Sequence, residues 1–77
     1  MTYIDVRTKE EYDKGHKEGA LLFDIMDMMQ GDFPEVPKDE EIILYCESGN
    51  RAGMAKTLME QAGFQHVTNA GSVEQYL

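Results

Sequence analysis

The hydrophobic and polar positions of the chain alternate between strand-like and helix-like segments. Short β-rich or continuously apolar runs predict strands at residues 2–6, 20–23, 42–45 and 66–70. Helical spacing of apolar positions, with glycines near the ends, predicts helices at residues 9–14, 24–30 and 51–62, and a short helix or tail at 73–77. Strands that alternate with helices favour an α/β fold, in which helices flank a small, central and largely parallel sheet.

Local signals define the ends of the predicted helices. Thr8 stands three residues before Glu11, the spacing of a capping box, so the first helix should begin directly after Thr8 and end at Gly15. The longest helix should end at Gly63, after which Phe64 can fold back against it. The apolar face of this helix is expected to consist of Ala55, Leu58, Met59 and Ala62.

Methionines cluster in the middle predicted helix. Ile25, Met28 and Met29 recur at helical spacing, which predicts that they form its inward apolar face. The cluster of Met26, Met28 and Met29 could instead be a soft metal site or a partner-binding stripe, but the spacing favours core packing. The segment 32–41, which follows, carries both prolines and a group of acids and is expected to be an exposed, solvated connection.

Length and composition exclude several classes of protein. The 77 residues suffice for one compact domain, 1–77, for which a monomer is expected. A net charge of −8 argues against a nucleic-acid partner, because binding to a phosphate backbone needs clustered lysine and arginine. No apolar run is long enough to span a membrane, and the N-terminus does not resemble a signal peptide. One cysteine and two distant histidines, His16 and His66, predict neither a disulfide nor a metal site.

The only cysteine, Cys46, lies at the end of the apolar run 42–45 and just before a glycine-containing turn. Ligands of open α/β sheets bind beyond the carboxyl ends of the strands. Backbone N–H groups of the turn, and the positive end of the dipole of the following helix, would stabilise an anion at the sulfur. A lone cysteine is often an inert buried residue, but Gly49 and Arg51 in this turn favour a nucleophilic thiolate.

Two separated motifs resemble those of the rhodanese-like sulfurtransferases. YCESGNRA, residues 45–52, has the CxxGxR spacing of the active-site loop of that family, and YIDVRTKEEYDKGHKEGA, residues 3–20, resembles its amino-terminal signature. VPKDEEIILYC and AGFQHVTNAG also follow the family, so the resemblance covers almost the whole chain. The chain is most similar to small bacterial single-domain rhodaneses of the phage-shock type, which are periplasmic after their leader is removed. The resemblance implies a rhodanese-like fold, and a periplasmic location if a leader was removed or a cytoplasmic one otherwise.

The resemblance also implies a mechanism. Cys46 would attack the sulfane sulfur of thiosulfate or another persulfide donor, hold it as a persulfide and pass it to a thiol or to cyanide. No metal or organic cofactor is implied. The cradle that stabilises the persulfide anion would be formed by N–H groups of the loop, contributed by Glu47, Ser48, Gly49, Asn50 and Arg51.

Two other functions stay open at this point. The same pocket could belong to a persulfide carrier or a partner-binding module that does not turn over, and a cysteine phosphatase is a more distant alternative. Phosphatases of this fold have one more residue between the cysteine and the arginine. The four residues between Cys46 and Arg51 favour a single sulfur atom over a phosphate group as the bound species.

The remaining motif residues receive supporting roles by the resemblance. Asp5 and Arg7 are expected to tie the first strand to neighbouring loops, although Arg7 could instead shape the pocket. His16 is expected to fix a turn rather than to act as a base, and His66 should lie on the surface. Glu47 places a carboxylate next to the nucleophile, where it would oppose the approach of dianionic thiosulfate. We therefore expect only modest thiosulfate activity.

Overall fold

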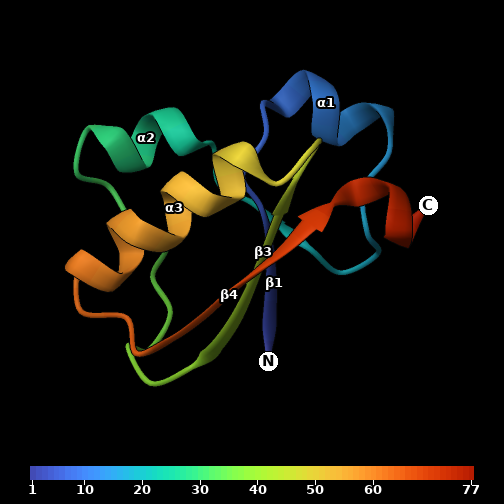
Figure 1. The fold of residues 1–77 in the computed structure, drawn as a ribbon. Helices are drawn as coiled ribbons and strands as arrows, with labels where there is room; N and C mark the ends of the chain where they lie inside the picture. The colour runs from blue at the N-terminus through green and yellow to red at the C-terminus, as the bar shows by residue number, and fades with distance from the viewer.

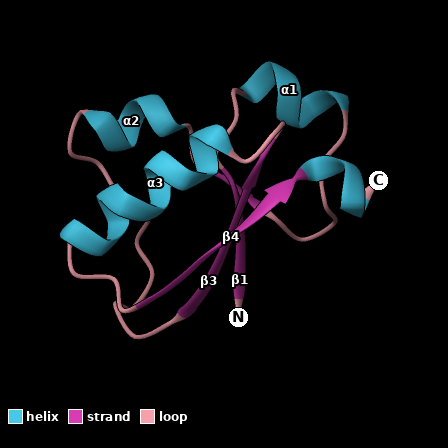
Figure 2. Cartoon of the chain, viewed as in Figure 1, coloured by secondary structure: helices cyan, strands magenta, loops and turns pink.

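The computed structural model describes residues 1–77, which form a four-stranded sheet with helices on both sides (Figure 1). The strands are β1 (Thr2–Asp5), β2 (Leu21–Leu22), β3 (Glu41–Cys46) and β4 (His66–Ser72). The helices are α1 (Lys9–Lys14), α2 (Ile25–Met29) and α3 (Asn50–Gln61), and a 3-10 helix, η1, follows at Val73–Tyr76. Figure 2 shows the same elements coloured by type, with loops at both ends of the sheet.

All neighbouring strands of the sheet are parallel, in the order β2-β1-β3-β4. This confirms the predicted α/β architecture and places β1 and β3 at the centre. Because the strands run in one direction, their carboxyl ends meet at a single edge of the sheet, where such folds bind ligands. The N-terminus lies at the opposite end of the strands (Figure 1).

The central strand β3 is covered on both faces, as its apolar sequence predicts. Ile42, Leu44 and Cys46 are fully buried in the larger core, which also contains the buried apolar residues of α2 and α3. Tyr45 points to the opposite face and packs in a smaller core with Val73 of η1. The alternation follows from the two-residue period of a strand, and it directs the Cys46 side chain toward α3.

The local signals for the helix ends are confirmed. The Thr8 hydroxyl accepts a hydrogen bond from the Glu11 N–H at 3.3 Å, and the Glu11 carboxylate accepts one from the Thr8 N–H at 3.1 Å. At the end of α3, the Phe64 N–H donates to the Met59 carbonyl at 3.0 Å, and the Phe64 ring is 3% exposed. The apolar face of α3 is buried or packed against the core through Ala52, Ala55, Leu58, Met59 and Ala62.

The prediction for the methionines of α2 is wrong for two of the three. Met28 is 1% exposed and packs in the core with Ile25, but Met26 and Met29 are 55% and 56% exposed. Because α2 has only five residues, it buries a single narrow stripe at positions i and i+3. The strand predicted at 20–23 is also shorter, because the Ala20 N–H turns back to the Lys17 carbonyl and only Leu21–Leu22 pairs with β1.

The connection 32–41 is mostly exposed, as predicted, but Phe33, Pro34 and Val36 contribute to the core. Pro34 is buried, and the Phe33 ring packs against Phe64 with 6.1 Å between ring centroids. None of the helices has the length and hydrophobicity that crossing a bilayer requires.

Candidate active site

Cys46 is the last residue of β3 and its side chain is fully buried. Its Sγ accepts hydrogen bonds from the backbone N–H groups of Gly49 at 2.9 Å and Ala52 at 3.4 Å. Ala52 lies in the first turn of α3 and was not among the predicted cradle residues. Both donors are fixed backbone dipoles at the start of a 12-residue helix, an arrangement that favours negative charge on the atom they contact. The N–H groups of the other loop residues do not donate a hydrogen bond to Sγ. That they stabilise the outer sulfur of a Cys46 persulfide stays a prediction.

The loop requires glycine at position 49. Gly49 has a φ of 99°, in the left-handed region, which residues with a side chain rarely adopt. A Cβ atom at this position would also lie 3.3 Å from the Cα atom of Gly71 in β4. The loop and the end of β4 are therefore packed backbone against backbone.

Asn69 of β4 holds the two segments together, and sequence reasoning missed it. Its side-chain Nδ2 donates to the Gly49 carbonyl at 3.0 Å, and its Oδ1 accepts from the Gly71 N–H at 2.9 Å. The register between β3 and β4 shifts between Leu44 and Cys46 at this point, as in a β-bulge, which commonly re-aims side chains next to sites. No local pattern in the sequence distinguishes Asn69 from an ordinary strand-end asparagine.

Arg51 is bound to Glu11 of α1 rather than free at the rim. Its Nη1 and Nη2 donate to Oε1 and Oε2 of Glu11 at 2.7 and 2.8 Å. These hydrogen bonds lower the pKa of Glu11 to about 2, with a further contribution from the Thr8 N–H, and they raise the pKa of Arg51. The local sequence predicts only the capping role of Glu11, and its ion pair with Arg51 becomes visible in the structure.

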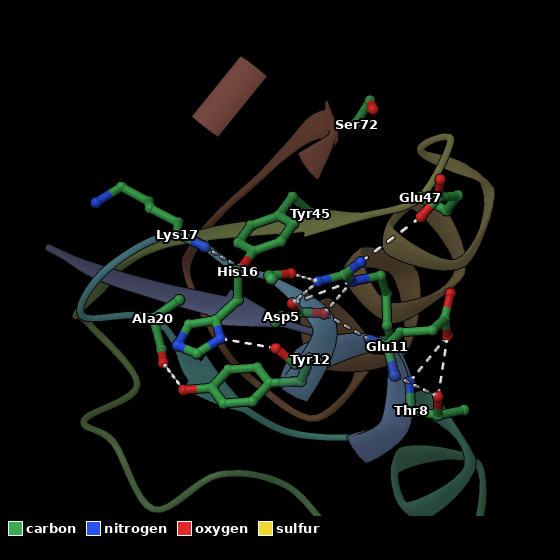
Figure 3. Close-up of polar contacts among 12 residues, drawn as sticks. Asp5, Thr8, Glu11, Tyr12, His16, Lys17, Ala20, Tyr45, Glu47 and Ser72 are labelled. Atoms are coloured by element: carbon green, nitrogen blue, oxygen red, sulfur yellow. Dashed lines mark hydrogen bonds and ion pairs between the residues drawn. The ribbon is translucent and has the colours of Figure 1, made fainter. Parts of the chain in front are cut away.

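Asp5 and Arg7 form a buried pair at the end of β1 (Figure 3). Arg7 Nε and Nη2 donate to Asp5 Oδ1 and Oδ2 at 2.9 and 2.7 Å, and Nη2 also donates to the Gly15 carbonyl at 2.8 Å. The pair thus connects β1 to the end of α1, and the hydrogen bonds to Asp5 raise the pKa of Arg7. The Nη1 atom of Arg7 lies 3.6 Å from Oε2 of Glu47. The Glu47 side chain therefore points from the cysteine loop toward Arg7.

The two histidines lie away from the sulfur. The His16 ring stacks on Tyr12, with 3.6 Å between centroids, and its Nδ1 lies 2.8 Å from the Tyr12 carbonyl oxygen (Figure 3). The Tyr12 hydroxyl in turn donates to the Ala20 carbonyl at 2.6 Å. This geometry suits a residue that fixes a turn. His66 is exposed at the start of β4, at the end of the sheet opposite Cys46.

A cavity of about 270 Å³ lies beside the cysteine loop, between α1 and the C-terminal segment. A larger hollow of about 650 Å³ lies near β2 and α2, but no residue of the cysteine loop lines it, whereas Glu47 of that loop lines the smaller cavity. We therefore place the candidate site at the smaller cavity. No group of three or more histidine, cysteine or carboxylate side chains is arranged to hold a metal ion. The smaller cavity is lined by Arg7, Glu11, Lys14, Gly15, Glu47, Val73, Glu74 and Leu77.

The family model of the rhodanese-like domain matches residues 1–76. The chain belongs to the rhodanese-like family. This rhodanese-like domain is 33% identical over 73 residues to the thiosulfate sulfurtransferase PspE of Escherichia coli (strain K12), and the match covers 94% of the chain and 70% of PspE. A solved structure of a rhodanese with anions from E. coli has a TM-score of 0.80 and 30% identity, and the match covers 95% of this chain and 87% of that one.

Relatives within the family differ in size and in name. The tRNA uridine(34) hydroxylase of Cronobacter sakazakii is 33% identical over 81 residues, a match that covers 96% of this chain but only 23% of that protein. A rhodanese-like domain is therefore found in proteins with different activities. The family and the fold do not by themselves determine the reaction.

Proposed function

We propose that this rhodanese-like domain is a sulfurtransferase that moves sulfane sulfur through a Cys46 persulfide. The donor would be thiosulfate or a persulfide, and the acceptor a thiol or cyanide. The observation that carries the proposal is the environment of the sulfur, in which two backbone N–H groups donate to Sγ at the end of the central strand. The similarity to PspE, which is named a thiosulfate sulfurtransferase, supports the same reaction class.

The proposed reaction has two steps. The Cys46 thiolate attacks the outer sulfur of thiosulfate, the S–S bond of the donor breaks, and sulfite leaves with the electron pair of that bond. The cysteine then carries a persulfide, whose anionic outer sulfur the loop amides stabilise. In the second step a thiolate or cyanide attacks that outer sulfur, and the Cys46 thiolate is regenerated. Such covalent two-step catalysis predicts ping-pong kinetics.

Intact-mass spectrometry tests the persulfide directly. After incubation with thiosulfate, the protein should gain the mass of one sulfur atom, and subsequent cyanide should remove it. Cys46→Ser, which keeps the size of the side chain but removes the nucleophilic sulfur, should show neither change. If the wild-type mass never increases with any sulfane-sulfur donor, the proposed function is wrong.

A persulfide carrier without rapid turnover is the second candidate. The observation in its favour is the burial of Cys46, whose side chain is 0% exposed, so that an acceptor must reach a sulfur enclosed by its own loop. Steady-state assays with small thiols separate the two functions. A carrier would load once and release sulfur slowly, whereas an enzyme would produce many equivalents of product per Cys46.

A further inference from the structure

Both arginines of the chain are already bound to carboxylates near Cys46. Arg51 donates to the two oxygens of Glu11 at 2.7 and 2.8 Å, and Arg7 donates to the two oxygens of Asp5 at 2.9 and 2.7 Å. A bidentate pair satisfies both the charge and the planar geometry of a guanidinium group. Neither arginine therefore presents an uncompensated positive charge to an incoming anion.

The charges that remain at the cavity are predominantly negative. Glu47 and Glu74 line it, and Lys14 is the one lining cation that is not engaged in such a pair. The Glu47 side chain is 60% exposed, and its nearest cation is Arg7 at 3.6 Å, which Asp5 already neutralises. Figure 3 shows Glu47 on the loop beside this pair. The net charge of −8 for the whole chain adds to this local field.

We propose that Glu47 is a specificity-determining residue, which disfavours dianionic donors such as thiosulfate and favours an aminothiol persulfide. The inference rests on the proposed function, because it concerns the donor that loads Cys46. Glu47 follows the nucleophile directly, yet its carboxylate lies at the cavity wall beside Arg7. When the outer sulfur of a donor approaches Cys46, the rest of the donor molecule would lie near the Glu47 carboxylate. This carboxylate would attract an ammonium group on the donor and repel a sulfonate.

The transfer from such a donor balances without a further reagent. The Cys46 thiolate attacks the outer sulfur of the aminothiol persulfide, and the S–S bond of the donor breaks. The electron pair of that bond leaves with the aminothiol as a thiolate, which takes a proton from water, while Cys46 becomes the persulfide. No external oxidant or reductant takes part, because sulfane sulfur passes from one thiol to another.

The test measures the rate at which Cys46 gains sulfur from three donors, by rapid quench and intact-mass spectrometry. Thiosulfate is the dianion, cysteamine persulfide carries an ammonium group and is neutral overall, and 2-mercaptoethanol persulfide has a hydroxyl in place of the ammonium. For Glu47→Gln, loading by thiosulfate should rise by about three- to tenfold, and loading by cysteamine persulfide should fall by about the same factor. The hydroxyl analogue should rise less than thiosulfate because it carries a single negative charge.

Two variants provide matched controls. Glu41→Gln removes the same charge at the other end of β3, about 16 Å along the strand and beyond the screening length at physiological salt. It should leave the ratio between thiosulfate and cysteamine persulfide unchanged within about twofold. Lys14→Gln, which removes a cavity cation, should shift this ratio in the opposite direction to Glu47→Gln.

The outcomes separate this inference from the proposed function. If wild-type Cys46 gains sulfur but the donor ratio of Glu47→Gln equals that of Glu41→Gln, the specificity role of Glu47 is wrong and the sulfurtransferase stands. If Cys46 gains sulfur from none of the three donors, both proposals fail together. Because Glu47 is a mostly exposed loop residue, the substitution should leave the fold intact, and circular dichroism checks this directly.

Discussion

The two arginine pairs at the carboxyl edge of the sheet have the same bidentate geometry but lie in different surroundings. The pair of Arg7 and Asp5 is almost fully buried, with side chains 4% and 0% exposed. The pair of Arg51 and Glu11 is only partly covered, with side chains 35% and 30% exposed. The first pair joins residues that are two positions apart, whereas the second joins residues forty positions apart.

This difference indicates different tasks. A buried ion pair adds little net stability compared with an apolar replacement, but the loss of one partner leaves an uncompensated charge without water. The Asp5–Arg7 pair should therefore act as an obligatory structural element under the site. The Glu11–Arg51 pair is partly exposed to water and contributes less to the free energy of unfolding. It nevertheless connects α1 to the first turn of α3, from which Ala52 donates to the sulfur.

Breaking the buried pair should have the largest effect. Asp5→Asn removes the carboxylate and leaves the Arg7 guanidinium buried without its counter-charge, which should lower the free energy of unfolding by about 3–5 kcal/mol. Urea denaturation followed by circular dichroism measures this loss. For a domain of this size, the predicted loss approaches the entire free energy of unfolding.

A double variant shows whether the loss of stability in Asp5→Asn arises from the unpaired positive charge of Arg7. Asp5→Asn with Arg7→Met removes both charges, so it should be more stable than Asp5→Asn alone. A double variant that is as unstable as the sum of the two single variants would contradict this account of the pair.

Breaking the partly exposed pair should cost less, about 1 kcal/mol, and the cost should depend on pH. Arg51 lowers the pKa of Glu11 from 4.5 to about 2, so the stabilisation is present above pH 4.5 and is lost as the pH falls toward 2. Glu11→Gln should therefore be less stable than the wild type at pH 7, and the two should converge in acid. Urea denaturation as a function of pH measures both effects.

The neighbouring glutamate of the same helix turn is the control. Glu10→Gln changes the same charge near the same helix end, but Glu10 does not bind Arg51. Its stability difference from the wild type should be smaller and should not follow the titration of Glu11. If Glu10→Gln and Glu11→Gln behave alike, helix-end electrostatics and not the contact with Arg51 would explain the effect.

An ion pair within a single helix sets the lower end of the comparison. Lys56 and Glu60 of α3 lie 2.8 Å apart, with side chains 37% and 48% exposed. Lys56→Gln should lower the free energy of unfolding by no more than about 0.5 kcal/mol, and 1 M salt should abolish the difference because it screens exposed charges. Urea denaturation at both salt concentrations is the measurement. A loss as large as that of Glu11→Gln would show that a pair within one helix contributes as much as a pair that joins two helices.

Predictions from short segments of the sequence were the most successful. The capping box at Thr8 and Glu11, the burial of β3 and the turn of Phe64 onto α3 are confirmed. The position of Cys46 at the carboxyl end of a central strand is also confirmed. Each depends on residues within about one helical turn or one strand, where hydrophobic period and backbone preference dominate. The exposure of Met29 was missed because the width of the buried stripe depends on how α2 packs.

The sequence by itself determined the kind of site: a single cysteine between a buried strand and a glycine turn, in an acidic chain. Only the tertiary structure decided which groups surround the sulfur. Glu11 reaches Arg51 across forty residues, and Asn69 reaches Gly49 across twenty, because parallel crossovers bring distant strand ends to one edge. Contacts of this kind depend on how the helices and strands pack together. Local sequence patterns carry no information about that packing. The pairing of the charged side chains around the candidate site could therefore be seen only in the folded chain.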